Sequence, residues 1–445
     1  MFKFKRNGEK SLEKSMTSSR QKIFFGFFLI YFIISIFDAY ILIYIPLYYF
    51  NILNVNRLEL AFIQIFTYLT LIILPILALF YDRYIKNESQ MKRFFYFSFV
   101  PLCCSFLIFN LFKEYLILYG IFVCLKFIST SLIRTATTGI FLRYVSEGKT
   151  KTKILNRRLQ LIFIVNSASA LTYFIVSVAF NSLVLNVESL YVWNSFFVVG
   201  WVVSIPTIFL AFVYFRKMVF FEKNETKKEY DINMNKKMPN LEIISILILY
   251  IAVFLGFSDA LYSYPKSEWI YNKFTETGFR IYVSTYFLFT FCTFFGYYLF
   301  YLLNKRYHNH RKLILITISL YTPLMFLITV STFPSFMLLQ IFLSILGSIA
   351  NLTYVSHVTD ISIQKKHRTF IYQLLTTPST LANIIFLPLG TYLSNHISFE
   401  SLVVISCFLF IISIFLLGIT FFLKKKETVQ VLEYHIESIE KSQVS

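Results

Sequence analysis

Long apolar segments separated by short polar loops run along the whole chain. Windows of about nineteen residues predict twelve helices, each long enough at roughly 1.5 Å per residue to cross a hydrocarbon core about 30 Å thick. The pattern therefore predicts an all-α membrane protein of about twelve transmembrane helices. The predicted spans are 23–50, 58–81, 94–112, 115–144, 159–181, 190–215, 241–264, 279–303, 313–333, 335–363, 369–395 and 399–423.

Composition and charge agree with this prediction and give it an orientation. With 57% hydrophobic and 15% charged residues, the composition excludes a water-soluble fold. Lysine and arginine gather in both tails and in every second loop, so both termini are expected in the cytoplasm, and the net charge of +19 requires no nucleic acid partner. The expected organisation is a basic cytoplasmic tail at 1–22, a six-helix bundle at 23–215, a cytoplasmic loop at 216–240, a second six-helix bundle at 241–423 and a cytoplasmic tail at 424–445.

The two predicted bundles resemble each other in sequence. Short matches occur in the same order in both halves, at offsets between 210 and 222 residues. This order predicts two parallel six-helix pseudo-repeats, an arrangement found in many transporters. The matching segments are Ile36–Tyr40 with Phe257–Leu261, Asp82-Arg83 with Asn304-Lys305, Tyr144–Ser146 with Tyr354–Ser356, and Arg158 with Arg368.

The loop after the second predicted helix carries a family motif. Asp82 and Arg83 leave that helix, and Lys86 and Lys92-Arg93 follow. In this motif and in its two-half topology the chain resembles the major facilitator superfamily, although both glycines of the motif are absent here. The resemblance implies solute transport by alternating access. Asp82 can meet a helix N-terminus or a basic partner while the cytoplasmic side is closed, so Asp82 and Arg83 are predicted to form a gating loop; a solvated loop is the alternative.

Ionisable side chains inside the spans mark candidate sites, because a charge there costs on the order of 3 kcal/mol without a partner or water. Lys126, Thr130 and Arg134 share one face of the fourth predicted helix. Lys126 is the predicted ligand of an anionic substrate. Arg134 either extends to the cytoplasmic boundary, forms an ion pair or contributes to function. Asp38 either binds and releases a proton during transport or pairs with Lys126.

Further polar residues are predicted to line the cavity or to relay protons. His357 and Asp360 share one helix face, which suits a proton relay, but Asp360 is also close enough to Lys365-Lys366 for a structural pair. The resemblance implies that helices 1, 2, 4 and 5 of each half line the central cavity; interhelical hydrogen bonding is the alternative role for their uncharged polar residues. The predicted substrate-binding residues are Lys126, Thr130, Asn166, Tyr173, Tyr286, Thr290 and Gln373.

These features favour a secondary-active or facilitative transporter of a small solute, with a proton-coupled organic-anion carrier as the working hypothesis. A neutral sugar carrier and a lipophilic-compound exporter are alternatives of the same fold. A membrane-embedded transferase and a nontransporting receptor are alternatives from other classes, but no nucleotide loop or catalytic set is evident, so enzyme activity is not expected.

No cofactor or metal is expected, because all five cysteines fall in apolar spans. The expected partners are the solute, the lipid bilayer and protons or another coupling ion. We expect a monomer in the cell membrane.

Overall fold

The described part of the chain is built from helices. The computed structural model describes residues 23–39, most of 72–217, most of 240–306, and 310–420 apart from residue 364, with isolated positions before residue 60. A helix of this described part lies in each of the twelve predicted spans. Counted over the same residues, six helices are long and apolar enough to cross a membrane. The prediction of an all-α membrane fold is confirmed.

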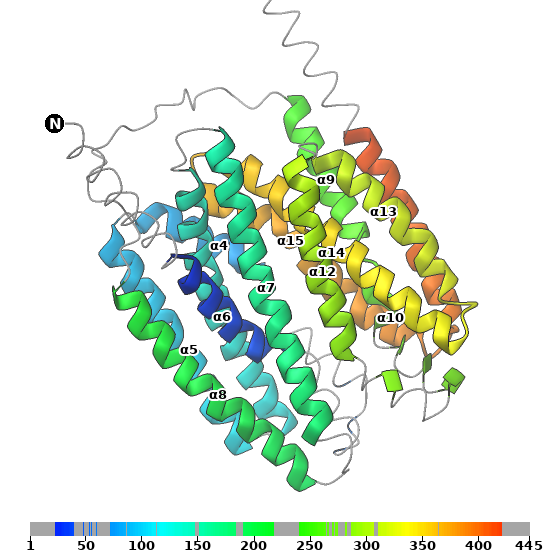
Figure 1. Ribbon diagram of the computed structural model, residues 1–445, viewed down its shortest axis with the longest axis horizontal. Helices are drawn as coiled ribbons and strands as arrows, with labels where there is room; N and C mark the ends of the chain where they lie inside the picture. Colours follow the sequence, from blue (N-terminus) through cyan, green and yellow to red (C-terminus); the bar gives the residue numbers. More distant parts are fainter. Residues whose placement is uncertain are drawn as a thin grey trace, which may run out of the picture.

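Figure 1 shows the helices of the first half gathered on one side of the molecule and those of the second half on the other. The two halves lie side by side, with the helices of each half roughly aligned along a common direction. The first half contains the helix Ile23–Ala39, α4 (Leu74–Tyr84), α5 (Glu88–Phe112), α6 (Leu116–Ser146), α7 (Lys151–Leu183) and α8 (Leu190–Lys217). The second half contains α9 (Asn240–Leu255), α10 (Ala260–Ser263), α12 (Tyr286–Arg306), α13 (His310–Leu327), α14 (Phe333–Ile363), α15 (Arg368–Leu393) and the helix Phe399–Thr420.

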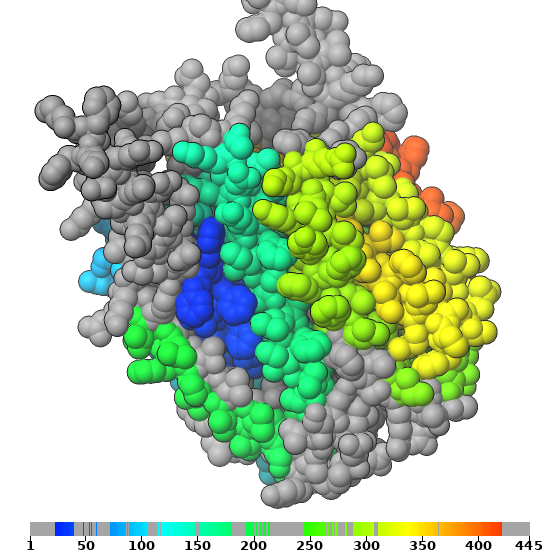
Figure 2. All heavy atoms as spheres, viewed as in Figure 1, coloured from blue at the N-terminus to red at the C-terminus, as the bar shows by residue number. Residues whose placement is uncertain are grey.

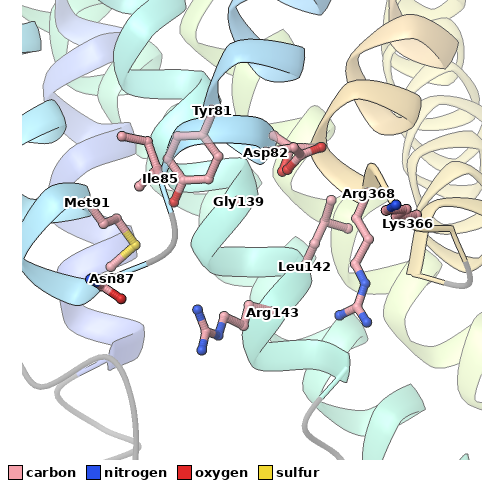
Figure 3. Close-up of a pocket in the computed structure, with 11 residues that line it drawn as sticks. Tyr81, Asp82, Ile85, Asn87, Met91, Gly139, Leu142, Arg143, Lys366 and Arg368 are labelled. Atoms are coloured by element: carbon pink, nitrogen blue, oxygen red, sulfur yellow. The ribbon is translucent and has the colours of Figure 1, made fainter. Parts of the chain in front are cut away.

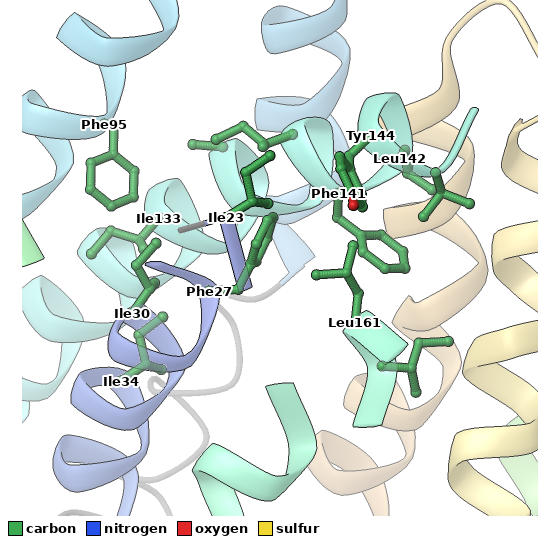
Figure 4. Packing of buried hydrophobic residues seen from close by; sticks show 14 of the residues in the cluster. Ile23, Phe27, Ile30, Ile34, Phe95, Ile133, Phe141, Leu142, Tyr144 and Leu161 are labelled. Carbon is green, nitrogen blue, oxygen red and sulfur yellow. The ribbon is translucent and has the colours of Figure 1, made fainter. Parts of the chain in front are cut away.

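The core of the first half follows from helical spacing. Ile23, Phe27, Ile30 and Ile34 are separated by four, three and four residues, so they share one face of the first helix. All four are buried and belong to one cluster with Ile133 of α6, as Figure 4 shows. Other large apolar side chains remain exposed on the outer surface of the protein, as expected where lipid is the solvent. Examples are Ile76, Phe97, Ile117, Phe209, Val330, Phe408 and Phe415.

Two helix pairs form the most extensive contacts between the two halves. α7 packs along α12, as the space-filling view in Figure 2 shows, and α4 packs along α15. On the first of these contacts, the ring of Phe163 lies 6.1 Å from that of Phe294 and 5.8 Å from that of Tyr301, measured between centroids. These pairings bring polar residues of the two halves together at the ends of the helices.

The span predicted at 241–264 is present as the apolar span Ile244–Ser263, but a short break interrupts its helix. α9 ends at Leu255 and α10 begins at Ala260, and the residues between form tighter i to i+3 hydrogen bonds, such as that from Ser258 N to Leu255 O at 3.2 Å. Hydroxyl groups support the break, because Ser258 Oγ donates to the Ser406 carbonyl at 3.2 Å and Ser406 Oγ donates to the Ser258 carbonyl at 2.8 Å. The side chains thereby help to satisfy polar backbone groups inside the membrane.

Gly390 lets α15 approach the chain just after this break. A Cβ added at Gly390 would lie 1.7 Å from the carbonyl oxygen of Leu261, which is a backbone atom and cannot rotate away. We expect Gly390→Ala to cost about 3 kcal/mol of stability, the upper end of the usual overpacking range. Thermal unfolding of the purified protein measures this loss. Gly418→Ala is the matched control, since nothing lies within 4 Å of its added Cβ; an equal loss in both variants would contradict the prediction.

Candidate functional site

A charged cluster, formed by Asp38, Lys126 and Arg134, joins the first helix to α6. Lys126 Nζ donates a hydrogen bond to Asp38 Oδ1, and Arg134 Nη2 donates to Asp38 Oδ2 at 2.8 Å. The side chains of Lys126 and Asp38 are 0% and 8% exposed, whereas that of Arg134 is 34% exposed. Because Lys126 and Arg134 are two turns apart on one face of α6, the carboxylate can lie between them and pair with both.

These residues form ion pairs, which were among the alternatives that the sequence left open. Asp38 pairs with Lys126, and Arg134 forms an ion pair inside the span Ile117–Ser146 instead of extending to the cytoplasmic boundary. The three side chains contribute two cations and one carboxylate. The charged cluster therefore has an excess of one positive charge in the interior of the first half.

The uncharged residues predicted to bind substrate are distributed over several helices. Thr130 is buried beside the charged cluster on α6, where its Oγ1 donates to the Phe127 carbonyl at 3.1 Å. Asn166 donates to the carbonyl of Ile162 on its own helix at 2.7 Å. Tyr173 on α7 and Thr290 on α12 are half-buried. Tyr286 begins α12, but its side chain lies outside the described residues.

Gln373 lies at the contact between the two halves. Its Nε2 on α15 donates to Thr138 Oγ1 on α6 at 3.1 Å, and both side chains are buried. The rings of Phe141 and Tyr372 meet beside this hydrogen bond, with 6.4 Å between their centroids. In this conformation Gln373 therefore joins the halves through a direct hydrogen bond. Its predicted role as a substrate ligand remains a prediction for another conformation.

Asp82 contacts a helix N-terminus from the opposite half. Its Oδ2 accepts a hydrogen bond from the backbone N–H of Phe370 at 3.0 Å, in the first turn of α15. This is the type of contact expected for an acid at that position, because a helix N-terminus carries partial positive charge. Arg83 is exposed, with its guanidinium carbon 5.8 Å from the centre of the Tyr84 ring. Only Asp82 of this predicted pair has a recorded hydrogen bond to the second half among the described residues.

Two arginines form hydrogen bonds between the halves at the same end of the molecule as Asp82. Arg158 of α7 donates to Asp360 Oδ1 on α14, and Arg368 of α15 donates to Ser146 Oγ on α6 at 2.7 Å. Arg158 and Arg368 are the two arginines that the internal repeat relates to each other. The repeat thus contained a signal for both contacts, but nothing in the sequence indicated their partners.

Asp360 pairs differently from the sequence expectation. Its partners are Arg158 and His310, whose Nε2 lies 3.1 Å from Asp360 Oδ2, rather than the nearby lysines at 365 and 366. His357 accepts a hydrogen bond from Arg311 Nε at 3.2 Å.

We call the hydrogen bonds and ion pairs between the two halves the cytoplasmic clamp, because they lie at the basic end of the molecule. It consists of Asp82 with Phe370, Thr138 with Gln373, Ser146 with Arg368, and Arg158 with Asp360 and His310.

Sequence reasoning also missed a polar contact in the second half. Lys266 Nζ donates to Gln340 Oε1 at 2.5 Å and lies 5.6 Å from the centre of the Tyr282 ring. Burial lowers the pKa of Lys266 to about 8, and the neighbouring Asp259 carboxylate opposes that shift. Asp259 is half-buried rather than fully hydrated. Its position in the repeat corresponds to Asp38, so each half places an acid near a lysine, although the lysine comes from a different element in each.

The comparisons with known proteins agree with this architecture. Residues 246–435 match the sequence model of the Major Facilitator Superfamily. Over nearly the whole length, the structure is similar to the human organic anion transporter MFSD10 (TETRAN), with a TM-score of 0.62, 12% identity, and coverage of 90% of this chain and 98% of that chain. The family model thus matches much of the second half of the chain, and the structural similarity shows that the whole chain shares this fold. The structure is also similar to the E. coli fucose:proton symporter FucP, with a TM-score of 0.61, 12% identity, and coverage of 89% of this chain and 98% of that chain.

The comparisons show the fold of the protein and do not identify a solute. The sequence match covers the second half, and the structural similarity extends the same fold over the first half, where the charged cluster lies. No curated protein matches the sequence. The chain is thus a multi-pass membrane protein with the fold of these two transporters.

Proposed function

We propose that this protein carries a small organic anion, such as a carboxylate or a phosphate ester, by alternating access. The excess positive charge of the charged cluster is the observation that carries this proposal. An anion that reaches Lys126 and Arg134 gains two cations in a region of low dielectric, where the attraction is strong. A neutral solute would leave the excess charge uncompensated.

The arrangement of the cluster also supports proton coupling. Each oxygen of Asp38 is held by one cation, so an incoming anion competes with Asp38 for the same donors. Once displaced, a buried carboxylate without a cation is more stable in its protonated form. We therefore propose that Asp38 takes up a proton as the anion binds and returns it when the cation pairs re-form. Arg134 is the more exposed of the two cations and is proposed to contact the solute first.

The cytoplasmic clamp is proposed as the gate of this cycle. It links the two halves, for which we propose the bounds 23–215 and 241–423 with the connecting loop at 216–240. While the clamp is formed, the cytoplasmic side is closed at these contacts. Release into the cytoplasm requires the clamp to break and the halves to move apart. Tyr173 and Thr290, which lie on helices of opposite halves, are proposed to contact the solute when the cavity is formed.

The test is uptake by the purified protein in liposomes, with labelled organic anions, sugars and amino acids, and with or without an inward proton gradient. We expect saturable anion uptake that the gradient accelerates. Lys126→Ala should lower anion uptake roughly 10- to 100-fold, because a hydrogen bond to a charged group contributes about 1.5–3 kcal/mol. Lys305→Ala removes an exposed cation of α12 and serves as the matched control.

Other results of the liposome assay would favour a different function. Uptake of a neutral sugar that persists in Lys126→Ala would replace the anion proposal by the sugar carrier. Movement of lipophilic compounds alone would favour the exporter. If no solute moved although the protein was folded and inserted, the receptor interpretation would gain support.

A further inference from the structure

A cavity of about 180 Å³ lies between the two halves at the cytoplasmic end, separate from the charged cluster. It is more than ten times the roughly 15 Å³ that a single water requires, so a phosphate group has room in it. α4 and α6 of the first half and the start of α15 contribute to its walls. The lining, drawn in Figure 3, includes Tyr81, Asp82, Arg143, Lys366, Arg368 and Thr369.

The cavity is strongly basic. Arg143, Lys366 and Arg368 line it together with one carboxylate, that of Asp82, which already accepts the N–H of Phe370. Figure 3 shows Arg143 on the α6 side of the cavity, and Arg368 and Lys366 on the α15 side. These cations belong to different halves, so one anion in the cavity can contact both halves. A bound anion would add attraction across the contact between the halves.

The first turn of α15 adds uncharged donors to the same space. Arg368 and Thr369 are its first two residues, and helix N-termini carry partial positive charge and backbone N–H groups without helical partners. The cavity therefore combines three cationic side chains with an anion-binding backbone arrangement. Phosphate suits this combination because it has several oxygen atoms that can accept hydrogen bonds from both halves.

The location of the cavity favours a phosphate that belongs to a lipid. It lies at the basic end of α4, where the positive-inside pattern places the cytoplasmic leaflet and its anionic head groups. Exposed apolar side chains continue along α4 from this end, namely Ile76, Leu79 and Phe80, at 66%, 40% and 48% exposure. They give the acyl chains of a lipid a surface to lie on. A free phosphate would make no use of them.

We propose that this cavity binds the phosphate of an anionic phospholipid, whose head group bridges Arg143 to Lys366 and Arg368 and holds the cytoplasmic clamp closed. The proposal concerns lipid binding alone and does not depend on which solute is carried. It also assigns a role to Arg143 and Lys366, which form no part of the clamp contacts described above. Loss of these cations should weaken lipid binding without removing the clamp hydrogen bonds.

The experiment measures lipid binding to the full-length purified protein by native mass spectrometry and by the shift in its unfolding temperature. Phosphatidylglycerol, phosphatidylcholine and inorganic phosphate are added separately. We expect phosphatidylglycerol to bind and to raise the unfolding temperature, and the other two to have much smaller effects. The double variant Arg143→Gln/Lys366→Gln should bind phosphatidylglycerol roughly 30-fold more weakly, from about 1 kcal/mol for each cation.

Lys305→Gln removes an exposed cation outside the cavity lining and should bind phosphatidylglycerol like the wild type. If the double variant is unstable without lipid, Lys366→Gln alone, at an exposed position, should still lose about fivefold in affinity. Equal phosphatidylglycerol binding by the wild type and by the folded cavity variants would overturn the proposal. Equal stabilisation by phosphatidylcholine would also overturn it, and equal stabilisation by inorganic phosphate would assign the cavity to free phosphate instead.

Discussion

Asp38→Asn is expected to abolish proton-driven uptake and to lower the stability of the protein by about 3–5 kcal/mol, the usual cost of breaking a buried ion pair from one side. The reason is that two cations would remain in the interior of the first half without their carboxylate. Lys126 is fully buried there, so water cannot replace the lost partner. Uptake in liposomes and thermal unfolding of the same preparation measure the two effects.

A second substitution separates the structural effect from the transport effect. In Asp38→Asn/Lys126→Met, the most deeply buried cation is removed together with the acid, and the apolar part of the side chain is retained. We expect much of the stability to return while anion uptake remains absent. Glu114→Gln, which removes an exposed carboxylate, should leave both measurements unchanged. Normal gradient-dependent uptake by Asp38→Asn would disprove the proposed coupling role.

Asp360→Ala is expected to shift the conformational equilibrium toward the cytoplasm-open state roughly 10- to 100-fold, because a hydrogen bond to a charged group contributes about 1.5–3 kcal/mol. The substitution leaves Arg158, whose side chain is only 4% exposed, without its carboxylate while the clamp is closed. Opening the cytoplasmic side gives this guanidinium access to water. The closed state therefore loses more free energy than the open state.

Spin labels at Asn156 on α7 and Lys305 on α12 measure this shift as a change in the distance distribution between the halves. Both positions are exposed at the cytoplasmic end, and the five native cysteines are replaced beforehand. Asp360→Glu keeps the charge and should restore part of the closed population. Asp259→Asn, which alters an acid of the second half away from the clamp, should not increase the open population. An unchanged distance distribution in Asp360→Ala would show that this contact does not hold the gate.

Much of the fold was predictable from the sequence because the bilayer imposes a simple constraint. A helix that crosses it needs a long apolar segment, and a helix of the described part lies in every predicted span. The break at residues 256–259 was missed, because hydropathy measures the polarity of side chains and not the backbone hydrogen-bonding pattern. Gly256, Ser258 and Asp259 are weak helix formers, but their positions alone did not indicate where α9 would end.

The sequence indicated which residues belong to the candidate site, but not how they contact one another. Charged residues in apolar spans require partners, so Asp38, Lys126 and Arg134 could be selected before any contact was known. The spacing on α6 placed Lys126 and Arg134 on one face. It could not show that Asp38 contacts both cations, because that depends on the packing of the first helix against α6.

The sequence by itself determined the helical membrane fold and the residues that carry charge into the membrane, and it predicted two related halves and an orientation from the basic loops. These properties depend on local polarity and helical spacing. Only the tertiary structure decided that one carboxylate serves two cations, that Arg158 meets Asp360 and His310, and that Arg143, Lys366 and Arg368 surround one cavity. Each of these arrangements joins residues far apart in the chain, and their distances are set by how the helices and the two halves pack.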